Sequence, residues 1–458
     1  MAYRSLNPFT EQAISHFDNH TDTEVEAILS TADALYRSDW SKGDVSARLT
    51  ILEALADLLV ENREKLAQVM AQEMGKPISQ GRKEIDLCTS IARYYATNAA
   101  NLLRPQPVAN DIGEGWVEYH PIGVLLAVEP WNFPIYQLIR VIAPAIALGN
   151  PVVFKHASIV PKCALLFEDI LRQAGAPKGA VTNLFISAAQ VAELLGDALI
   201  QGVALTGSEG AGSKVGARAA EMIKKSTLEL GGSDVFVVLD DADLKKAVSA
   251  GVSARIANAG QVCIGAKRFV VQRGIADDFI SAFVTGMKSV MMGDPLEEET
   301  QLGPLASAEA LADLCQQVES AVQNGAQVLT GGKRADRTGF FYEPTVLAQI
   351  SKDNPAYYQE FFGPVAQIYI VDDDQEVIAL ANDSLFGLGG SIFSTDINRA
   401  RLLASQIETG MVFINTPTTS RPSLPFGGIK RSGYGRELGE SGLLEFANRK
   451  LVVIAASH

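Results

Sequence analysis

Hydrophobic periodicity separates the chain into a helical beginning and a longer alternating part. From about Asp22 to Ala99, apolar residues recur at three- and four-residue spacing with charges on the other face, as in "SARLTILEALADLLVENREKL". This spacing predicts amphipathic helices. Residues 100–122 lose that spacing, and their turn residues and short alternation predict a β-excursion from the main body.

Two series of short apolar runs follow, and helical stretches separate the runs. The first series extends from Gly123 to Leu239 and includes "GVLLAVEP", "PVVFK", "GVALTG" and "DVFVVLD". The second extends from Asp243 to about Phe446 and includes "RFVVQ" and "PVAQIYIVDD". Continuous apolar strands that alternate with helices predict an α/β fold with parallel sheets covered on both faces. The terminal run in "FANRKLVVIAASH" predicts a further strand, whose edge needs a partner such as another subunit.

Composition and charge exclude several classes of protein. The 458 residues are too many for one compact core, so two to three domains are expected. A content of 47% hydrophobic and 20% charged residues is typical of a globular α/β protein. The net charge of −14, without any basic run, repels a phosphate backbone, so no nucleic-acid partner is expected. No apolar stretch reaches the roughly 18 residues that a membrane span requires.

The cysteines and histidines do not form a recognisable framework. The four cysteines are far apart in sequence and lack C-x-x-C spacing, and the first residues lack the apolar core of a signal peptide. We therefore expect no disulfide framework and a cytoplasmic location. His16 and His20 are four residues apart, but no third ligand lies near them, so no metal site is expected.

Loops that follow the strands are the first candidates for chemistry, because ligands bind at the carboxyl ends of open parallel sheets. Asn132 in "VEPWNFP" is either a turn residue or a donor to an oxyanion. Lys155 after "PVVF" is either solvated or in contact with a ribose or phosphate. The segment "ALTGSEGAGSKVG" is neither a dinucleotide fingerprint nor a P-loop. Gly207 and Ser208 nevertheless open a helix whose backbone N–H groups suit a pyrophosphate.

Glu229 and Cys263 are candidates for a base and a nucleophile. Glu229 lies in an uncharged neighbourhood before two glycines and an apolar strand, where a carboxyl pKa should rise. The alternative is a glutamate at a helix end that faces water. Cys263 is a lone cysteine without a nearby histidine, which gives little support to a Cys–His dyad. Spacing alone leaves a reactive thiol and an inert packing residue both open.

Seven motifs occur in order over nearly the whole chain. They are "PWNFP", "FK" followed by "S", "LTGS", "LELGG", "NAGQVC", "EFFGPV" and "PFGGIKRSGYGRELG". The set resembles the NAD(P)-dependent aldehyde dehydrogenase superfamily, and within it the chain is similar to bacterial succinate semialdehyde dehydrogenases. The resemblance implies two parallel-sheet α/β domains plus a small β oligomerisation excursion. It implies a dinucleotide-binding domain at 1–99 and 123–230, a catalytic domain at 231–446, and an oligomerisation segment at 100–122 and 447–458 of a homodimer or homotetramer.

The resemblance also implies the catalytic roles. Cys263 matches the thiolate that attacks the aldehyde carbon to form a thiohemiacetal and then a thioester. Asn132 and the Cys263 N–H match the oxyanion donors, and Glu229 matches the base that activates water for deacylation. The cofactor is NAD or NADP, and both are expected to be accepted, because Ser158 stands where many NAD-selective relatives carry a glutamate. The residues that match cofactor contacts are Trp131, Asn132, Lys155, His156, Ala157, Ser158, Gly207, Ser208, Leu230, Glu360 and Phe362.

The expected substrate is a small aldehyde with a distal carboxylate, oxidised as succinate semialdehyde to succinate. By resemblance Arg140 faces the substrate entrance and anchors that carboxylate, while Ser420 and Arg421 assist. The family's second anchoring arginine is replaced here by Ala257, although Arg255 is close. Alternatives remain: Arg140 pairs with a surface acid, the substrate is glutarate semialdehyde or an aliphatic or amino aldehyde, or the protein is a cysteine thioester hydrolase.

Overall fold

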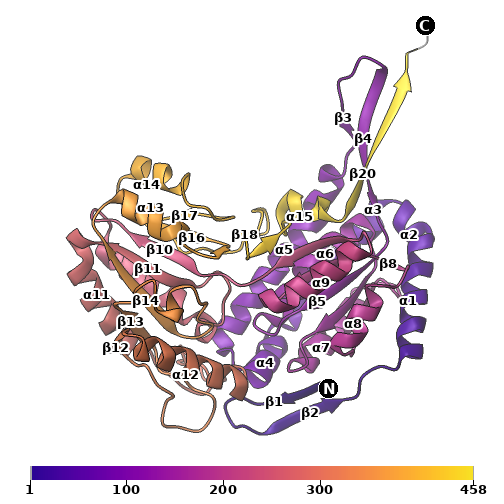
Figure 1. Ribbon diagram of the computed structural model, residues 1–458. Coiled ribbons are helices and arrows are strands. Elements are labelled where there is room, and N and C mark those ends of the chain that lie inside the picture. The colour runs from indigo at the N-terminus through magenta and orange to yellow at the C-terminus, as the bar shows by residue number, and fades with distance from the viewer. Residues whose placement is uncertain (1–2, 457–458) are drawn as a thin grey trace.

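Two sheets form the centres of two lobes in the computed structural model, which describes residues 3–456 (Figure 1). The first sheet has six strands in the order β19-β9-β8-β5-β6-β7, all parallel except β19. Its strands are β5 (Val124–Glu129), β6 (Val152–His156), β7 (Val181–Asn183), β8 (Ile200–Thr206), β9 (Lys225–Glu229) and β19 (Gly433–Tyr434).

Helices from the first half of the chain cover this sheet. They are α1 (Asp22–Arg37), α2 (Asp39–Lys42), α3 (Val45–Glu61), α4 (Arg63–Met74), α5 (Ile78–Leu102), α6 (Pro134–Leu148), α7 (Pro161–Gln173), α8 (Ala188–Leu194) and α9 (Glu209–Glu221). Among residues 3–456, no helix is long and apolar enough to cross a membrane.

The second sheet has seven strands in the order β12-β13-β14-β11-β10-β16-β17, and only its edge strand β12 is antiparallel. The strands are β10 (Asp234–Val238), β11 (Ala266–Gln272), β12 (Gln327–Thr330), β13 (Thr345–Ala348), β14 (Val365–Val371), β16 (Gly390–Phe393) and β17 (Phe413–Ile414). The accompanying helices are α10 (Leu244–Ile256), α11 (Arg273–Lys288), α12 (Ala308–Gln323), α13 (Asp374–Asn382) and α14 (Ile397–Ala404). The predicted α/β class with two parallel sheets is confirmed.

A third, small sheet projects from the first lobe (Figure 1). It consists of β20 (Ala447–Ala455), β4 (Gly113–Pro121) and β3 (Gln106–Pro107) in that order. The expectation that the terminal strand needs a partner from outside the chain is wrong, because β20 pairs with β4 along its whole length. A free edge nevertheless remains on β20 within the described residues, and its Leu451 and Ile454 are 59% and 56% exposed.

The chain passes from the first lobe to the second once and then returns. Residues 230–233 connect β9 to β10, close to the expected boundary. However, β19 pairs with β9, and α15 (Gly439–Glu445) packs against α6, so this part of the expected catalytic segment lies on the first lobe. An N-terminal hairpin of β1 (Tyr3–Leu6) and β2 (Ala13–Phe17) bridges both lobes, since the Arg4 N–H donates to Ser158 O and the Phe340 N–H to Pro8 O.

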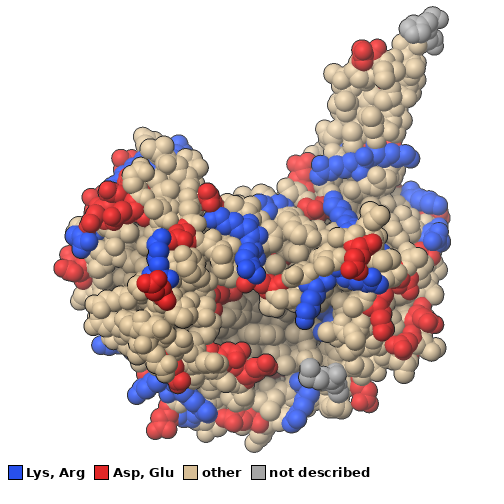
Figure 2. Space-filling view, in the orientation of Figure 1, with Lys and Arg blue, Asp and Glu red and all other residues tan. Residues whose placement is uncertain are grey.

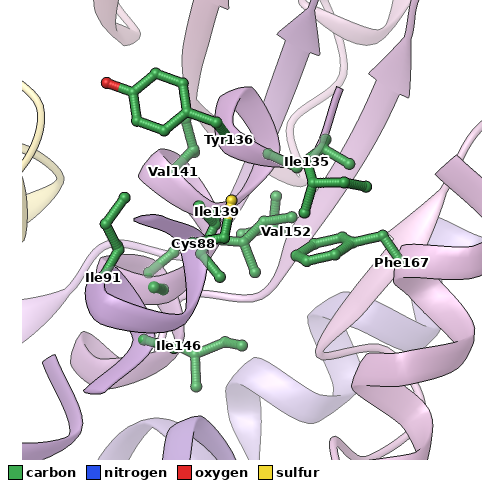
Figure 3. Close-up of a cluster of buried hydrophobic side chains, with 14 of the residues drawn as sticks. Cys88, Ile91, Ile135, Tyr136, Ile139, Val141, Ile146, Val152 and Phe167 are labelled. Carbon is green, nitrogen blue, oxygen red and sulfur yellow. The ribbon is translucent and has the colours of Figure 1, made fainter. Parts of the chain in front are cut away.

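Helix α6 is the centre of the first core. All 15 of its residues are buried, because it lies between the sheet and helices α3 and α5. Figure 3 shows Tyr136, Ile139 and Ile146 of this helix with Cys88 of α5 and Phe167 of α7. Burial raises the pKa of the Cys88 thiol well above its usual value, which makes Cys88 an inert packing residue.

The loop between β5 and α6 is held by buried polar groups. His156, at the end of β6, is fully buried; its Nε2 lies 2.9 Å from Pro134 O and its Nδ1 lies 2.9 Å from the Ala157 N–H. These contacts fit a neutral ring that donates through Nε2 and accepts through Nδ1. On the other side, Glu84 of α5 accepts from the N–H groups of Ile135 (2.9 Å) and Tyr136 (3.0 Å), at the first turn of α6. The N-terminus of α6 and the loop before it are therefore fixed from two directions.

We predict that His156 makes the protein sensitive to mild acid. Burial lowers its pKa from 6.5 to about 4. Below pH 6.5 the imidazole therefore binds a proton in the unfolded chain but not in the folded chain. The stability is complete above pH 6.5 and falls by about 3 kcal/mol as the pH drops toward 4. His156→Gln should be less stable at pH 7.5 but lose less on acidification. Melting temperatures from pH 7.5 to 4.5 test this, and parallel curves for the two proteins would contradict it.

Candidate active site

Cys263 lies in a tight turn between the short 3-10 helix η1 (Ala257–Gly260) and β11. The backbone of Asn258, Ala259 and Gly260 is left-handed, with φ of 49°, 53° and 75°. At Gly260 a Cβ would collide with the carbonyl of Gly363, so the sharp turn requires glycine there. The Cys263 side chain is partly exposed and packs against the core of the first lobe. It therefore lies where the two lobes meet, and the surface is hollowed between them (Figure 2).

Asn132 joins the first lobe to the cysteine turn. Its Nδ2 donates to Gln261 O at 3.0 Å, and its Oδ1 accepts from Gln137 Nε2 at 3.0 Å. In return, Asn258 Nδ2 donates to the Asn132 carbonyl at 2.7 Å. One hydrogen of the Asn132 amide remains for a further acceptor beside the turn. The structure thus brings together Asn132 and the Cys263 turn, which the sequence placed on separate loops.

Glu229 ends β9 in a nearly closed site. It is 2% exposed, and neither carboxylate oxygen has a hydrogen-bond partner among residues 3–456. Burial and the nearby Glu437 raise its pKa well above 4.5, although Arg140 and Arg436 oppose the shift. A Cβ on Gly427 would lie 2.6 Å from its Oε1, so this glycine makes room for the carboxyl group. The carboxyl of Glu229 therefore holds a proton more tightly than an exposed glutamate does.

The thiol of Cys263 is protonated at neutral pH. Burial raises its pKa to about 12, while the cations of Arg140 and Lys267 act in the opposite direction. Glu229 and Glu360 add to the increase. A thiol in this environment needs a base before it can attack a carbonyl carbon.

Arg140 does not face an open entrance as expected. It is 1% exposed, its Nε lies 2.8 Å from Glu437 Oε2, and its Nη2 donates to Thr206 Oγ1 at 3.1 Å and also to Gln137. The guanidinium lies over the rings of Tyr136 and Phe426, 4.7 Å from each centroid. The alternative of a surface ion pair is also wrong, because its partner Glu437 is buried. Two donors, Nε and Nη1, have no hydrogen-bond partner among the described residues, and of these only Nε lies in the ion pair with Glu437.

The acids around Arg140 were not identified from the sequence. Glu129 and Glu437 are 3% and 5% exposed, and burial raises the pKa of both, with that of Glu129 well above 4.5. Glu437 lies in the polar stretch "GRELGES", where no local signal marks it. A search for acids at the ends of predicted buried strands would have found Glu129.

The other expected substrate residues differ in position. The Ser420 hydroxyl lies 2.6 Å from the Tyr136 hydroxyl, beside Arg140. Arg421 is exposed and forms no side-chain hydrogen bond or ion pair with any described residue. Arg255 is fully buried and donates to Gly260 O at 2.6 Å, so it supports the cysteine turn and does not face a substrate.

Glu360 forms a second polar site beside Cys263. Its carboxylate lies 3.0 Å from Lys267 Nζ and accepts from the Gly232 N–H at 3.2 Å. The rings of Trp131 and Phe362 meet edge to face at 5.9 Å, in a groove of about 550 Å³ that Glu360 also lines. A Cβ on Gly231 would collide with the Glu360 carboxylate. This groove has the aromatic walls and the carboxylate that a nucleoside requires.

The remaining expected cofactor residues lie along the ends of β6 and β8. Burial lowers the pKa of Lys155 from 10.5 to about 8, and its Nζ donates to His156 O at 3.1 Å. Two details differ from the sequence expectations. The His156 ring points into the core and cannot contact a ligand, and the Gly207 N–H is taken by Glu229 O at 2.9 Å. Ser208 caps α9, whose Gly212 leaves room for the side chain of Leu230. Ala157 and Ser158 are partly exposed.

Within residues 3–456, no group of three or more His, Cys, Asp or Glu residues is arranged to hold a metal ion. The groups that meet at the site are the Cys263 thiol, the Asn132 amide and the buried Glu229 carboxyl.

Comparison with known proteins extends these observations. The model of the aldehyde dehydrogenase family matches residues 1–452. A protein of Deinococcus radiodurans named succinate-semialdehyde dehydrogenase NADP(+) is 43% identical over 98% of this chain and 94% of its own length. A Synechocystis protein named probable succinate-semialdehyde dehydrogenase NADP(+) is 45% identical over 99% of this chain and 100% of its own.

A solved structure gives the same answer for the fold. The crystal structure of succinic semialdehyde dehydrogenase from Streptococcus pyogenes in complex with NADP+ has a TM-score of 0.98 and 46% identity, over 99% of this chain and 100% of that one. Since the family model spans nearly the whole sequence and the relatives match over full length, the chain belongs to the aldehyde dehydrogenase family.

Proposed function

We propose that this enzyme oxidises succinate semialdehyde to succinate with NADP or NAD, through a thioester on Cys263. The observation that carries the proposal is the meeting of Cys263, the Asn132 amide and the buried Glu229 at the junction of the lobes. The names of the relatives from Deinococcus radiodurans and Synechocystis support the substrate.

The three residues have complementary roles in the proposed reaction. Glu229 takes the thiol proton, and the Cys263 thiolate attacks the aldehyde carbon to form a thiohemiacetal. The free N–H of the Asn132 amide and the Cys263 N–H donate to the developing oxyanion, which is worth roughly 3 kcal/mol in a dry site. Loss of a hydride from the thiohemiacetal carbon leaves the thioester. Glu229 releases its first proton to solvent and then accepts a proton from the water that attacks the thioester. A carboxyl with a raised pKa suits both proton transfers.

The residues of the groove and the strand ends fit a dinucleotide. Glu360 would hold the nicotinamide ribose between Trp131 and Phe362, and Lys155 would lie beside the adenosine ribose. Gly210, in the first turn of α9, has open space around the place of its Cβ, which leaves room for a phosphate at that helix end. When bound, the cofactor supplies the hydride acceptor for the oxidation.

We also propose the assembly and the location. The exposed Leu451 and Ile454 lie on the free edge of β20, and pairing with a second copy would cover such an edge. This supports a homodimer or homotetramer. The four cysteines are all free, which supports a reducing cytoplasm.

Cys263→Ala and Glu229→Gln should separate the two halves of the reaction. Cys263→Ala should lower kcat by at least about 1,000-fold, because no covalent intermediate can form. Glu229→Gln should show a burst of NADPH followed by slow turnover, because the thioester forms but water is not activated. Rapid-mixing absorbance at 340 nm measures both. Turnover of Cys263→Ala near the parent level would refute the mechanism.

Ser158 should decide how the two cofactors compare. A serine and the neighbouring Lys155 accommodate a 2′-phosphate, whereas a carboxylate at this position would repel it. Ser158→Glu should raise KM for NADP about tenfold or more and change KM for NAD little, with Ser158→Gln as the uncharged control. Equal changes for both cofactors in Ser158→Glu would count against the assignment.

The substrate carboxylate is proposed to bind Arg140 Nη1 and the Ser420 hydroxyl. Loss of Arg140 also leaves Glu437 unpaired, so the informative quantity is kcat/KM for succinate semialdehyde divided by kcat/KM for butanal. In Arg140→Met this ratio should fall at least about tenfold, because butanal has no carboxylate. Arg140→Met/Glu437→Gln removes the unpaired charge, and Arg421→Met is the matched exposed arginine. An unchanged ratio in both Arg140 variants would make Arg140 purely structural.

A further inference from the structure

Lys267, the second residue of β11, is a buried cation in contact with the cysteine turn. Its side chain is 1% exposed, and its Nζ donates to Val262 O at 2.8 Å and to Cys263 O at 2.6 Å. The third partner is the Glu360 carboxylate, at 3.0 Å. Three donors of one ammonium thus meet three acceptors, and two of these are carbonyls of the turn itself.

The Glu360 carboxylate has the Lys267 ammonium as one of its few polar contacts. Apart from Lys267, its carboxylate accepts only from the Gly232 N–H, at 3.2 Å, within the described residues. Its backbone carbonyl accepts from Gln317 Nε2 of α12 at 3.1 Å, which holds the residue at the wall of the groove. Lys267 is therefore the only cation paired with Glu360 among residues 3–456.

The charged and titratable groups that act on Cys263 come from several elements. They are Arg140 and Tyr136 of α6, Lys267 of β11, Glu229 of β9, and Glu360 before β14. Arg140 is already paired with Glu437 and is bound to Gln137 and Thr206. Of the two cations, Lys267 alone contacts the backbone of Cys263.

We propose that Lys267 is a positioning residue that couples the ribose-binding carboxylate of Glu360 to the reactivity of Cys263. It fixes the turn through two carbonyls, which orients the Cys263 N–H, and its charge offsets that of Glu360 beside the thiol. The inference rests on the proposed function, because Glu360 and Cys263 are the cofactor and nucleophile sites of that reaction. Burial raises the pKa of Cys263 to about 12, and Lys267 limits the increase whereas Glu360 adds to it.

Alkylation of Cys263 tests the coupling without any turnover. The parent is Cys315→Ser, because Cys88 and Cys163 are fully buried and Cys315 is the other partly exposed thiol. Without cofactor, the rate of iodoacetamide labelling at fixed pH between 8 and 9.5 follows the thiolate fraction, with Cys263→Ala as the blank. One pKa unit changes that fraction tenfold, and altered nucleophilicity cancels part of the change, so about three- to tenfold effects are expected.

The two partners should shift the rate in opposite directions. Lys267→Met should slow labelling about three- to tenfold, Glu360→Gln should accelerate it by a similar factor, and the double variant should return close to the parent. Lys267→Arg should restore most of the rate. Damage to the fold alone would change the labelling rates of both single variants in the same direction, and that result would overturn the proposal.

Arg268→Met is the matched control. Arg268 is the neighbouring buried cation of β11, and it donates to three carbonyls, those of Ser233 (2.9 Å), Leu380 (2.8 Å) and Ala381 (3.0 Å). The Arg268→Met variant should have a lower melting temperature and an unchanged rate of Cys263 labelling. If Lys267→Met does not fold, Glu360→Gln decides, because an unchanged or slower rate there would refute the coupling. If instead the proposed function fails, the parent will not reduce NADP with succinate semialdehyde, while the labelling rates remain measurable.

Discussion

The pair of hydrogen bonds between Asn132 and the cysteine turn is the contact on which the site depends. Asn132 Nδ2 donates to Gln261 O, and Asn258 Nδ2 donates to the Asn132 carbonyl, so each lobe holds a loop of the other. Since both amides are buried, losing either partner would leave a desolvated polar group, which costs about 1–3 kcal/mol. The relative position of the Cys263 thiol and the Asn132 amide is therefore set by polar contacts that neither lobe could satisfy alone.

The rigidity of this contact comes from the surroundings of α6. The helix is buried along its whole length, Glu84 caps its first turn, and His156 holds the loop before it. Glu84 is in turn paired with the buried Lys76, whose Nζ lies 3.8 Å from the centroid of the Phe133 ring. Buried ion pairs contribute little net stability, but breaking one is costly, so such a pair specifies a single arrangement. Here the arrangement that it specifies is that of the Asn132 loop.

Charge is distributed unevenly around the thiol. Three buried glutamates, Glu129, Glu229 and Glu437, surround the single guanidinium of Arg140, and desolvation raises the pKa of all three. Arg140 and Arg436 offset the increase for Glu229 only in part, so each of the three carboxyls holds a proton more tightly than an exposed glutamate does. Lys267 is paired with Glu360, and the charges of this pair act on the Cys263 thiol together with those of Arg140 and Glu229.

The sequence by itself determined the class of fold and the family. Strand and helix periodicity depends on local burial, so the alternating runs predicted both sheets, and the order of the motifs around Asn132, Glu229 and Cys263 predicted the site. Only the tertiary structure decided which groups are buried and paired. The terminal strand has its partner in β4, His156 points into the core, and Arg140 is bound to Glu437. These outcomes depend on contacts between residues far apart in the chain, such as Arg140 with Glu437 and Glu229 with Gly427, and no local pattern records them.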